Sequence, residues 1–311
     1  MENKMNTIII TGGTGFIGTN LTQKLLTKGY SVVILTRNPD RFLSHTESLT
    51  YAGWDGKTAD GWGNLVNEAK AIINLAGESI ASTRWTNEKK SKILQSRINA
   101  GNAMIDAIKK AKHQPEVLIQ ASAIGYYGSR SESLNETSSP GLGFLPDVAI
   151  QWEASTKEAI NYGIRHVIIR TGLVLGENDG FLKILIPVFK WYLGGYFGDG
   201  MQWMSWIHIV DEVNAIIHCL ENNTIKGPVN VVSPNPVQAK YFYKTLANVL
   251  HRPCLFKIPE FAIKLLLGQM AEELILSSQK VHPDVLISTK FNFTYSNLYE
   301  ALYSLLSKQS R

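Results

Sequence analysis

The stretch TGGTGFIG, residues 11–18, decides the fold of this 311-residue chain. It follows TIIIT, residues 7–11, a short β-branched run that is typical of a buried strand. An apolar pattern with helical spacing comes next and ends at Gly29. A glycine-rich turn between a strand and a helix is the arrangement that binds the pyrophosphate of a dinucleotide.

Each glycine of this turn has a separate physical task. Gly12 allows the tight turn, Gly15 lets backbone N–H groups approach the pyrophosphate, and Gly18 lets the helix pack against the strand. The N-terminus of the helix adds free donors and a positive potential. We therefore predict that the cofactor contacts the loop residues Gly12, Thr14, Gly15, Phe16, Ile17 and Gly18.

The end of the next expected strand, SVVILT at residues 31–36, indicates which dinucleotide is bound. An NAD site places a carboxylate there for the ribose hydroxyls. This chain has Arg37 and Asn38 instead, and Arg41 follows one helical turn later. Because a guanidinium pairs with a 2′-phosphate, we predict NADP(H) in preference to NAD(H). The alternative is that Arg37 is an ordinary solvated surface arginine.

The rest of the chain alternates between expected strands and helices. Strands are predicted at residues 71–75, 117–121, 165–170 and 229–232, and helices at residues 88–112 and 146–162. This alternation predicts an α/β fold, a Rossmann-like doubly wound parallel sheet.

After Thr171 the pattern loosens and aromatic residues become frequent, so we expect a second, smaller domain. The dinucleotide-binding domain would comprise residues 1–170 plus about 207–234. A C-terminal α+β cap over the substrate would comprise about residues 171–206 and 235–311, with a short strand at 291–293.

The composition limits the class of protein. With 44% hydrophobic and 18% charged residues it is ordinary for a globular chain. A net charge of +5 suits an anionic small ligand, and without a dense Lys/Arg block we expect no nucleic-acid partner. Apolar runs too short for a membrane span or signal peptide, and two distant cysteines, favour a cytoplasmic protein. Neither the cysteines nor the histidines have metal-ligand spacing, so we expect no metal.

Several spaced motifs carry a family resemblance. They are TGGTGFIG, NLAG at 74–77, QASAIGYYG at 120–128, RTGLVLG at 170–176 and SWIHIVDEV at 205–213. Together they resemble the extended short-chain dehydrogenase/reductase superfamily, in its NAD(P)-dependent epimerase/dehydratase group. The C-terminal part resembles the small domain of an atypical, epimerase-family subgroup. The resemblance implies that the cofactor also contacts Leu75, Ala76 and Gly77.

In ordinary members of this superfamily a serine and a tyrosine bind the substrate oxygen. A lysine four residues after the tyrosine lowers its pKa. Ser122 matches the serine and is expected beside both substrate and cofactor. None of the 12 tyrosines has a lysine at the fourth position after it. Tyr126 with Arg130 is the nearest imitation, but we favour a structural tyrosine there.

The resemblance also implies where the tyrosine–lysine pair should stand, because the superfamily lysine precedes the terminal arginine of the next strand by about twenty-one residues. Counted back from Arg170, the two positions fall near Ala149 and Leu145, so neither reacting side chain is present. The subgroup is known for lacking this pair and tends to carry an arginine in place of an upstream asparagine. Arg97 fits that substitution and could bind an anion or stabilise an oxyanion. The alternative is a solvated arginine on a basic helix face.

Other polar residues are expected to have structural roles. Glu153 is expected to be solvated or paired on a helix whose Trp152 faces inward, and Lys157 to lie on the surface. His208 and Asp211 are expected to be structural hydrogen-bonding groups. The aromatic-rich set Trp203, Met204 and Trp206 either lines the substrate cleft or belongs to the core.

Two functions remain open at this point. One is an NADP(H)-dependent oxidoreductase or nucleotide-sugar-epimerase-like enzyme, with Ser122 and Arg97 acting on a small-molecule substrate that is anionic if Arg97 binds it. The other is a non-catalytic NADP(H)-binding sensor or regulatory protein, which the missing tyrosine and lysine suggest. Either a monomer or a homodimer is compatible with the sequence.

Overall fold

The computed structural model describes residues 6–42, 46–177 and 179–307. Its centre is a parallel sheet of seven strands in the order β12-β7-β5-β4-β1-β2-β3. These strands are β1 (Thr7–Thr11), β2 (Ser31–Thr36), β3 (Leu49–Gly53), β4 (Ala69–Asn74), β5 (Val117–Ala123), β7 (Arg165–Thr171) and β12 (Gly227–Val231). The expected doubly wound α/β fold is confirmed, and the strand order reverses between β1 and β4, where such sheets bind ligands.

The edge strand β3 is absent from the sequence-based prediction. Its residues, LTYAG, show neither clear alternation nor a continuous apolar run. It forms because β2 offers a free edge, along which Val32 to Thr36 pair with Leu49 to Gly53. A strand of this kind is specified by its partner more than by its own sequence.

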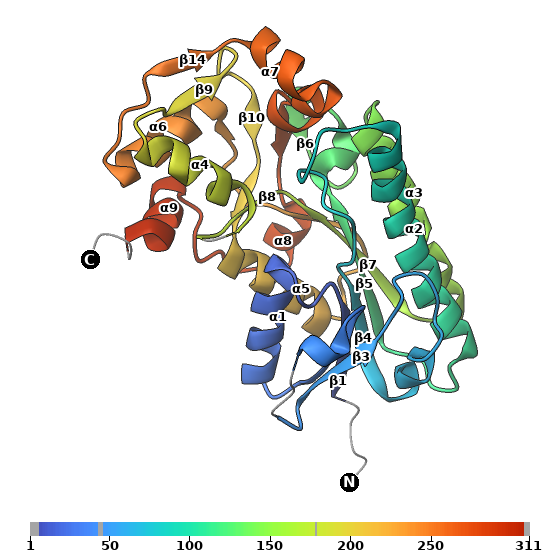
Figure 1. Cartoon of the computed structure of the whole chain (residues 1–311). Coiled ribbons are helices and arrows are strands. Elements are labelled where there is room, and N and C mark those ends of the chain that lie inside the picture. Colours follow the sequence, from blue (N-terminus) through green and yellow to red (C-terminus); the bar gives the residue numbers. More distant parts are fainter. Residues whose placement is uncertain (1–5, 43–45, 178, 308–311) are drawn as a thin grey trace.

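The helices cover both faces of the sheet (Figure 1). Helices α1 (Phe16–Thr27) and α5 (Ile209–Glu221) pack together on one face, and α2 (Asn87–Lys110) and α3 (Phe144–Ala154) on the other. Short helical turns are η1 (Pro39–Arg41), η2 (Gly63–Glu68), η3 (Ile124–Tyr127), η4 (Lys157–Tyr162) and η5 (Ala271–Ile275). Among the described residues, no helix is both long and apolar enough to cross a membrane.

The helix predicted at residues 146–162 is two shorter elements. α3 ends at Ala154 and the 3-10 turn η4 follows. At the break, the Ser155 hydroxyl donates to the carbonyl of Trp152, and the Thr156 hydroxyl is 2.9 Å from the His166 ring. Such side-chain bonds compete with the regular helix ladder, which explains why the helix ends early.

The C-terminal elements lie beyond the carboxyl ends of the sheet strands (Figure 1). Their helices are α4 (Gly180–Lys190), α6 (Ala239–Leu250), α7 (Glu260–Leu267), α8 (Asp284–Ser288) and α9 (Leu298–Leu306). Four two-stranded pairs accompany them: β8 (Leu173–Leu175) with β11 (Trp206–His208), β9 (Gly195–Phe197) with β14 (Phe256–Ile258), β10 (Trp203–Met204) with β13 (Val237–Gln238), and β6 (Arg130–Leu134) with β15 (Gln279–Val281). One buried cluster joins sheet residues to Phe242 of α6 and Leu302 of α9, so the core is continuous.

The strand predicted at residues 291–293 is wrong. Lys290 adopts a left-handed conformation (φ 59°), which turns the chain just before this segment. The following amides of Thr294 and Tyr295 donate to the Asp211 carboxylate, each at 2.8 Å, instead of to a strand. The apolar alternation there serves packing against the core, to which Phe291 contributes.

Candidate functional site

In the glycine-rich loop between β1 and α1, Gly12 and Gly18 stand where a hydrogen fits and a larger side chain does not. Gly12 has a φ of 67°, and a methyl group on it would lie 2.9 Å from the carbonyl of Leu75. A methyl group on Gly18 would lie 2.2 Å from the Gly12 oxygen. The first turn of α1 has no acidic residue and no side-chain cap, so its backbone N–H groups are available to phosphate oxygens.

The other loop residues have different tasks. Thr14 lines an open cavity, while Phe16 and Ile17 pack against the core. The Phe16 ring fills the space beside Gly176, where a methyl group would lie 2.2 Å from the ring. Phe16 therefore joins the loop to the segment after β8 as well as opening the helix.

A cavity of about 740 Å³ extends from this loop past the end of β2. Among the residues predicted for the cofactor, Gly12, Thr14, Arg37, Asn38, Arg41, Ala76 and Gly77 line it. The other predicted residues, Gly15, Phe16, Ile17, Gly18, Leu75 and Ser122, do not line it, and Leu75 packs against the core and presents its carbonyl to Gly12. Sequence reasoning missed the far walls, which come from the loop after β3 and from one face of α2: Trp54, Asp55, Gly56, Lys57, Ser91, Lys92, Gln95, Ser96 and Asn99.

Positively charged side chains predominate in the lining of this cavity. Its two acidic residues are engaged: Glu78 accepts from Lys89 at 2.6 Å, and Asp55 accepts from the backbone amides of residues 57 and 58. These hydrogen bonds lower the pKa of both carboxyls. Arg37, Arg41 and Lys57 form no hydrogen bond or ion pair through their side chains among the described residues, although Arg37 is near enough to Glu78, and Lys57 to Asp55, to lower the pKa of that carboxyl.

Buried polar side chains hold the carboxyl ends of the neighbouring strands together. The Thr11 hydroxyl donates to Asn74 at 2.6 Å, and Asn74 donates to Gln120 at 2.8 Å. The amide of Ala76 donates back to Thr11 at 3.1 Å. This chain across β1, β4 and β5 sets the position of the residue 75–77 segment above the glycine-rich loop.

Ser122 lies at the end of β5 and is only 4% exposed. Its hydroxyl donates to Oε1 of Glu153 on α3 at 2.7 Å. Arg170, at the end of β7, holds the same carboxylate through two bonds of 2.9 Å each. Glu153 is thus paired rather than solvated, and the Ser122 hydrogen is directed to it.

The Arg170 guanidinium is enclosed by aromatic rings. It lies 3.5 Å from the centroid of Tyr126 and donates to the Tyr127 hydroxyl at 3.1 Å. Pairing with Glu153 raises its pKa further above the usual range despite its burial. Arg130 instead donates to the carbonyls of Tyr127 and Ser139, so Tyr126 and Arg130 do not form a catalytic-type pair.

Arg97 is half-buried rather than solvated, which contradicts the alternative of an exposed basic face. Its guanidinium lies 4.7 Å from the centroid of Trp152, and Nη1 donates to the carbonyls of Glu78 and Ile93. Burial lowers its pKa to about 10, so it remains charged at neutral pH. A methyl group on Gly77 would lie 3.0 Å from its Cζ, which places it directly beside the cofactor cavity.

Hydrophobic packing fills the positions where a tyrosine and a lysine are missing. Leu145 packs in a cluster with Leu267 and Met270 of the C-terminal segment, and Ala149 is 3% exposed. The first amides of α3 donate to the Glu273 carboxylate, which fixes this segment on the helix. Lys157 lies outside this region, exposed on η4.

The other residues that the sequence analysis singled out make contacts that stabilise the fold. The His208 ring accepts from the Val210 amide at the start of α5, and burial lowers its pKa to about 4. Trp206 is fully buried in the core, whereas Trp203 is partly exposed beneath the Lys280 ammonium. The described residues contain no group of three or more His, Cys, Asp or Glu side chains that could hold a metal ion.

Comparison with protein families and known proteins agrees with this geometry. Residues 8–232 match the NAD dependent epimerase/dehydratase family, and residues 258–305 match a domain of unknown function, DUF1731. The chain is 41% identical over 302 residues to the epimerase family protein YfhF of Bacillus subtilis, covering 96% of this chain and 98% of that one. It is 37% identical to the chloroplastic epimerase family protein SDR39U1 homolog of Arabidopsis thaliana, covering 98% and 88%.

Solved structures extend the comparison. The human epimerase family protein SDR39U1, crystallised with NADPH, superposes with a TM-score of 0.86 at 27% identity, covering 97% of this chain and 99% of that one. A UDP-glucuronic acid 4-epimerase from Bacillus cereus, crystallised with UDP-glucuronic acid and NAD, superposes with a TM-score of 0.77 over 97% and 99%. At 19% identity, this second likeness concerns the fold alone.

Proposed function

Because this chain belongs to the NAD dependent epimerase/dehydratase family and is an NAD(P)-binding protein, we propose that it selects NADP(H) and uses it in an oxidoreductase or epimerase-like reaction on a small anionic substrate. The observation that carries the cofactor choice is the pair Arg37 and Arg41, which line the cavity and whose side chains form no hydrogen bond or ion pair among the described residues.

The charge distribution supports NADP(H) over NAD(H). β2 ends in Thr36 and is followed by Arg37, so the end of this strand supplies no carboxylate to accept from the ribose hydroxyls of NAD. A 2′-phosphate beside Arg37 and Arg41 would accept charge-assisted hydrogen bonds, each contributing about 1.5–3 kcal/mol. The human relative that was crystallised with NADPH adds support from outside the chain.

The side chains around Ser122 support a reaction that is not the usual tyrosine–lysine mechanism. NADP(H), when bound, supplies the hydride chemistry. Because the Ser122 hydrogen is directed to Glu153, the serine oxygen keeps its lone pairs to accept from a substrate hydroxyl. Arg97 keeps its charge beside Gly77 and would bind a carboxylate or a phosphate of the substrate, or stabilise a developing oxyanion.

A second candidate function is supported by the packing at Leu145 and Ala149. Leu145 packs in an apolar cluster and Ala149 is 3% exposed, and neither side chain can transfer a proton. A protein that binds NADP(H) and senses it, without turnover, is consistent with such a helix.

Titration of the purified chain with NADPH and NADH tests the cofactor proposal. Arg37→Ala with Arg41→Ala should weaken NADPH binding at least about tenfold and leave NADH binding nearly unchanged. Lys24→Ala, an exposed cation of α1 away from the cavity, serves as the control. Equal losses for both cofactors would contradict the assignment of the 2′-phosphate.

A screen of carbonyl compounds and nucleotide sugars, followed by NADPH absorbance, decides between enzyme and sensor. Conversion that is lost in Ser122→Ala and in Arg97→Ala, with NADPH binding intact in Ser122→Ala, supports the enzyme. Conversion that survives both changes contradicts the residue assignment. Normal NADPH binding with no conversion of any compound favours the sensor.

A further inference from the structure

On the face of α3 and η4, no helix of the described residues covers the strip of the sheet between these helices and the start of β12. The connection that leads to β12 runs through α5, which lies on the face of α1, so α3 and η4 are the last helices on the opposite face. On that face, the strand next to α3 and η4 is β7. Its Ile168 is only partly buried, although β7 is an interior strand of the sheet. A half-covered apolar strand of this kind leaves space for a ligand.

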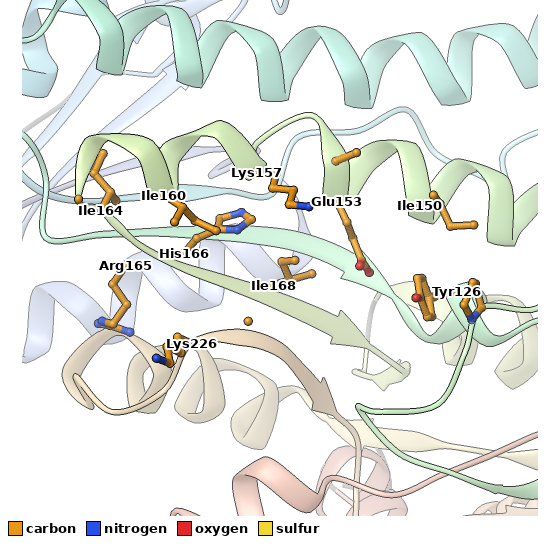
Figure 2. A pocket seen from close by; sticks show the side chains of 14 residues that line it. Tyr126, Ile150, Glu153, Lys157, Ile160, Ile164, Arg165, His166, Ile168 and Lys226 are labelled. Carbon is orange, nitrogen blue, oxygen red and sulfur yellow. The ribbon is translucent and has the colours of Figure 1, made fainter.

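The space is a groove of about 760 Å³ between α3, η4, β7 and the start of β12. Figure 2 shows Ile150, Glu153, Lys157 and Ile160 along the helical wall, and His166 and Ile168 on the floor. Its apolar lining comprises Pro140, Ile150, Ala154, Ile160, Ile164 and Ile168. No residue is shared with the cofactor cavity, so the groove is a separate site.

The charges that border this groove are predominantly positive. Lys157 and Lys226 have no hydrogen-bond or ion-pair partner among the described residues, and both line it. Arg165 also lines it and donates to the carbonyls of Cys219 and Leu220 at the end of α5 and of Ile225 in the loop that follows, and it keeps its charge. The lining carboxylate Glu153 is neutralised by Arg170.

His166, on the floor of the groove, adds no charge at neutral pH. His166 is buried, its ring is 2.9 Å from the Thr156 hydroxyl, and burial lowers its pKa to about 4. The groove therefore combines an apolar strip with two unpaired ammonium groups on opposite walls, Lys157 on the helical wall and Lys226 beside Arg165 at the start of β12.

We propose that this groove binds an acyl chain that ends in a carboxylate. The carboxylate binds at the Lys226 end of the groove, where Arg165 adds a second positive charge, and Lys157 adds a third from the helical wall. The chain lies along Ile160 and Ile168 towards the Tyr126 end, where the paired carboxylate of Glu153 gives an anionic head no attraction. This site stands independently of which reaction the cofactor serves.

Calorimetric titration of the full chain with dodecanoate, below its micelle concentration, tests the proposal. The wild type should bind dodecanoate saturably and bind dodecanol at least about tenfold more weakly. Lys157→Ala with Lys226→Ala should weaken dodecanoate at least about tenfold, and Ile160→Glu should do the same by adding a negative charge to the wall.

Matched controls separate the groove from general effects. Lys244→Ala removes an exposed lysine of α6, and Ile184→Glu changes an isoleucine of α4 that is 60% exposed, against 54% for Ile160. Both controls should bind dodecanoate as the wild type does, and all variants should keep NADPH binding.

Three results would overturn the proposal. They are the absence of saturable dodecanoate binding, equal losses in groove and control variants, and a wild-type dimer that Ile160→Glu dissociates. The last result, measured by light scattering, would show that a second copy of the chain fills the groove.

Discussion

Replacing Glu153 by alanine should destabilise the fold strongly, because it leaves the Arg170 guanidinium buried without its carboxylate. The two side chains are 11% and 5% exposed, and two hydrogen bonds of 2.9 Å join them. Breaking a buried pair from one side costs about 3–5 kcal/mol, since the remaining charge stays desolvated. Against a typical total of about 5–15 kcal/mol, this is a large fraction of the stability.

The remaining contacts of Arg170 set the size of the effect. Tyr126 and Tyr127 still surround the guanidinium, but neither supplies a negative charge. Ser122 also loses its acceptor, which adds to the cost. Glu153→Gln keeps the volume and one acceptor, so it should cost less, about 1–3 kcal/mol.

Urea unfolding at neutral pH measures these free energies, with the slope compared between variants to confirm that the unfolding transition is the same. The control is Glu158→Ala, which removes an exposed carboxylate that pairs with Lys109 at 2.9 Å on the neighbouring turn. The double variant Glu153→Leu with Arg170→Met should be more stable than Glu153→Ala, because no buried charge remains. A Glu153→Ala loss no larger than that of Glu158→Ala would refute the reasoning.

Three further predictions follow from packing and burial. Gly18→Ala should lower the free energy of unfolding by about 1–3 kcal/mol and abolish NADPH binding in a titration, because the added methyl would lie 2.2 Å from a backbone oxygen. The control Gly53→Ala should do neither, because its methyl would lie 3.8 Å from the nearest side chain. Burial raises the pKa of Glu212 from 4.5 to about 8, so between these values the folded chain keeps a proton that the unfolded chain releases. The free energy of unfolding should therefore fall as pH rises through this window, and Glu212→Gln should flatten the fall in urea titrations; an unchanged slope would contradict it. Ala149→Lys introduces a lysine at a position that is 3% exposed, so it should lower the urea midpoint strongly without creating turnover. A stable and active variant would contradict this expectation.

The sequence alone determined the parts whose signal is local. TIIIT and TGGTGFIG define a strand, a tight turn and a helix start within twelve consecutive residues, 7–18, and the structure places all three there. The alternation of strands and helices likewise predicted the doubly wound sheet, because each element carries its own hydrophobic period. The absence of the tyrosine–lysine pair could also be read directly, by counting along the chain.

Only the tertiary structure decided what Glu153 does. Its partners lie 31 residues before it and 17 after it, at the ends of two strands, and no local pattern relates them. The same holds for Arg97, whose burial depends on Trp152 from another helix, and for β3, which exists because β2 offers an edge. Local propensity is a property of neighbours along the chain, whereas pairing, burial and charge neutralisation depend on segments that meet only after folding.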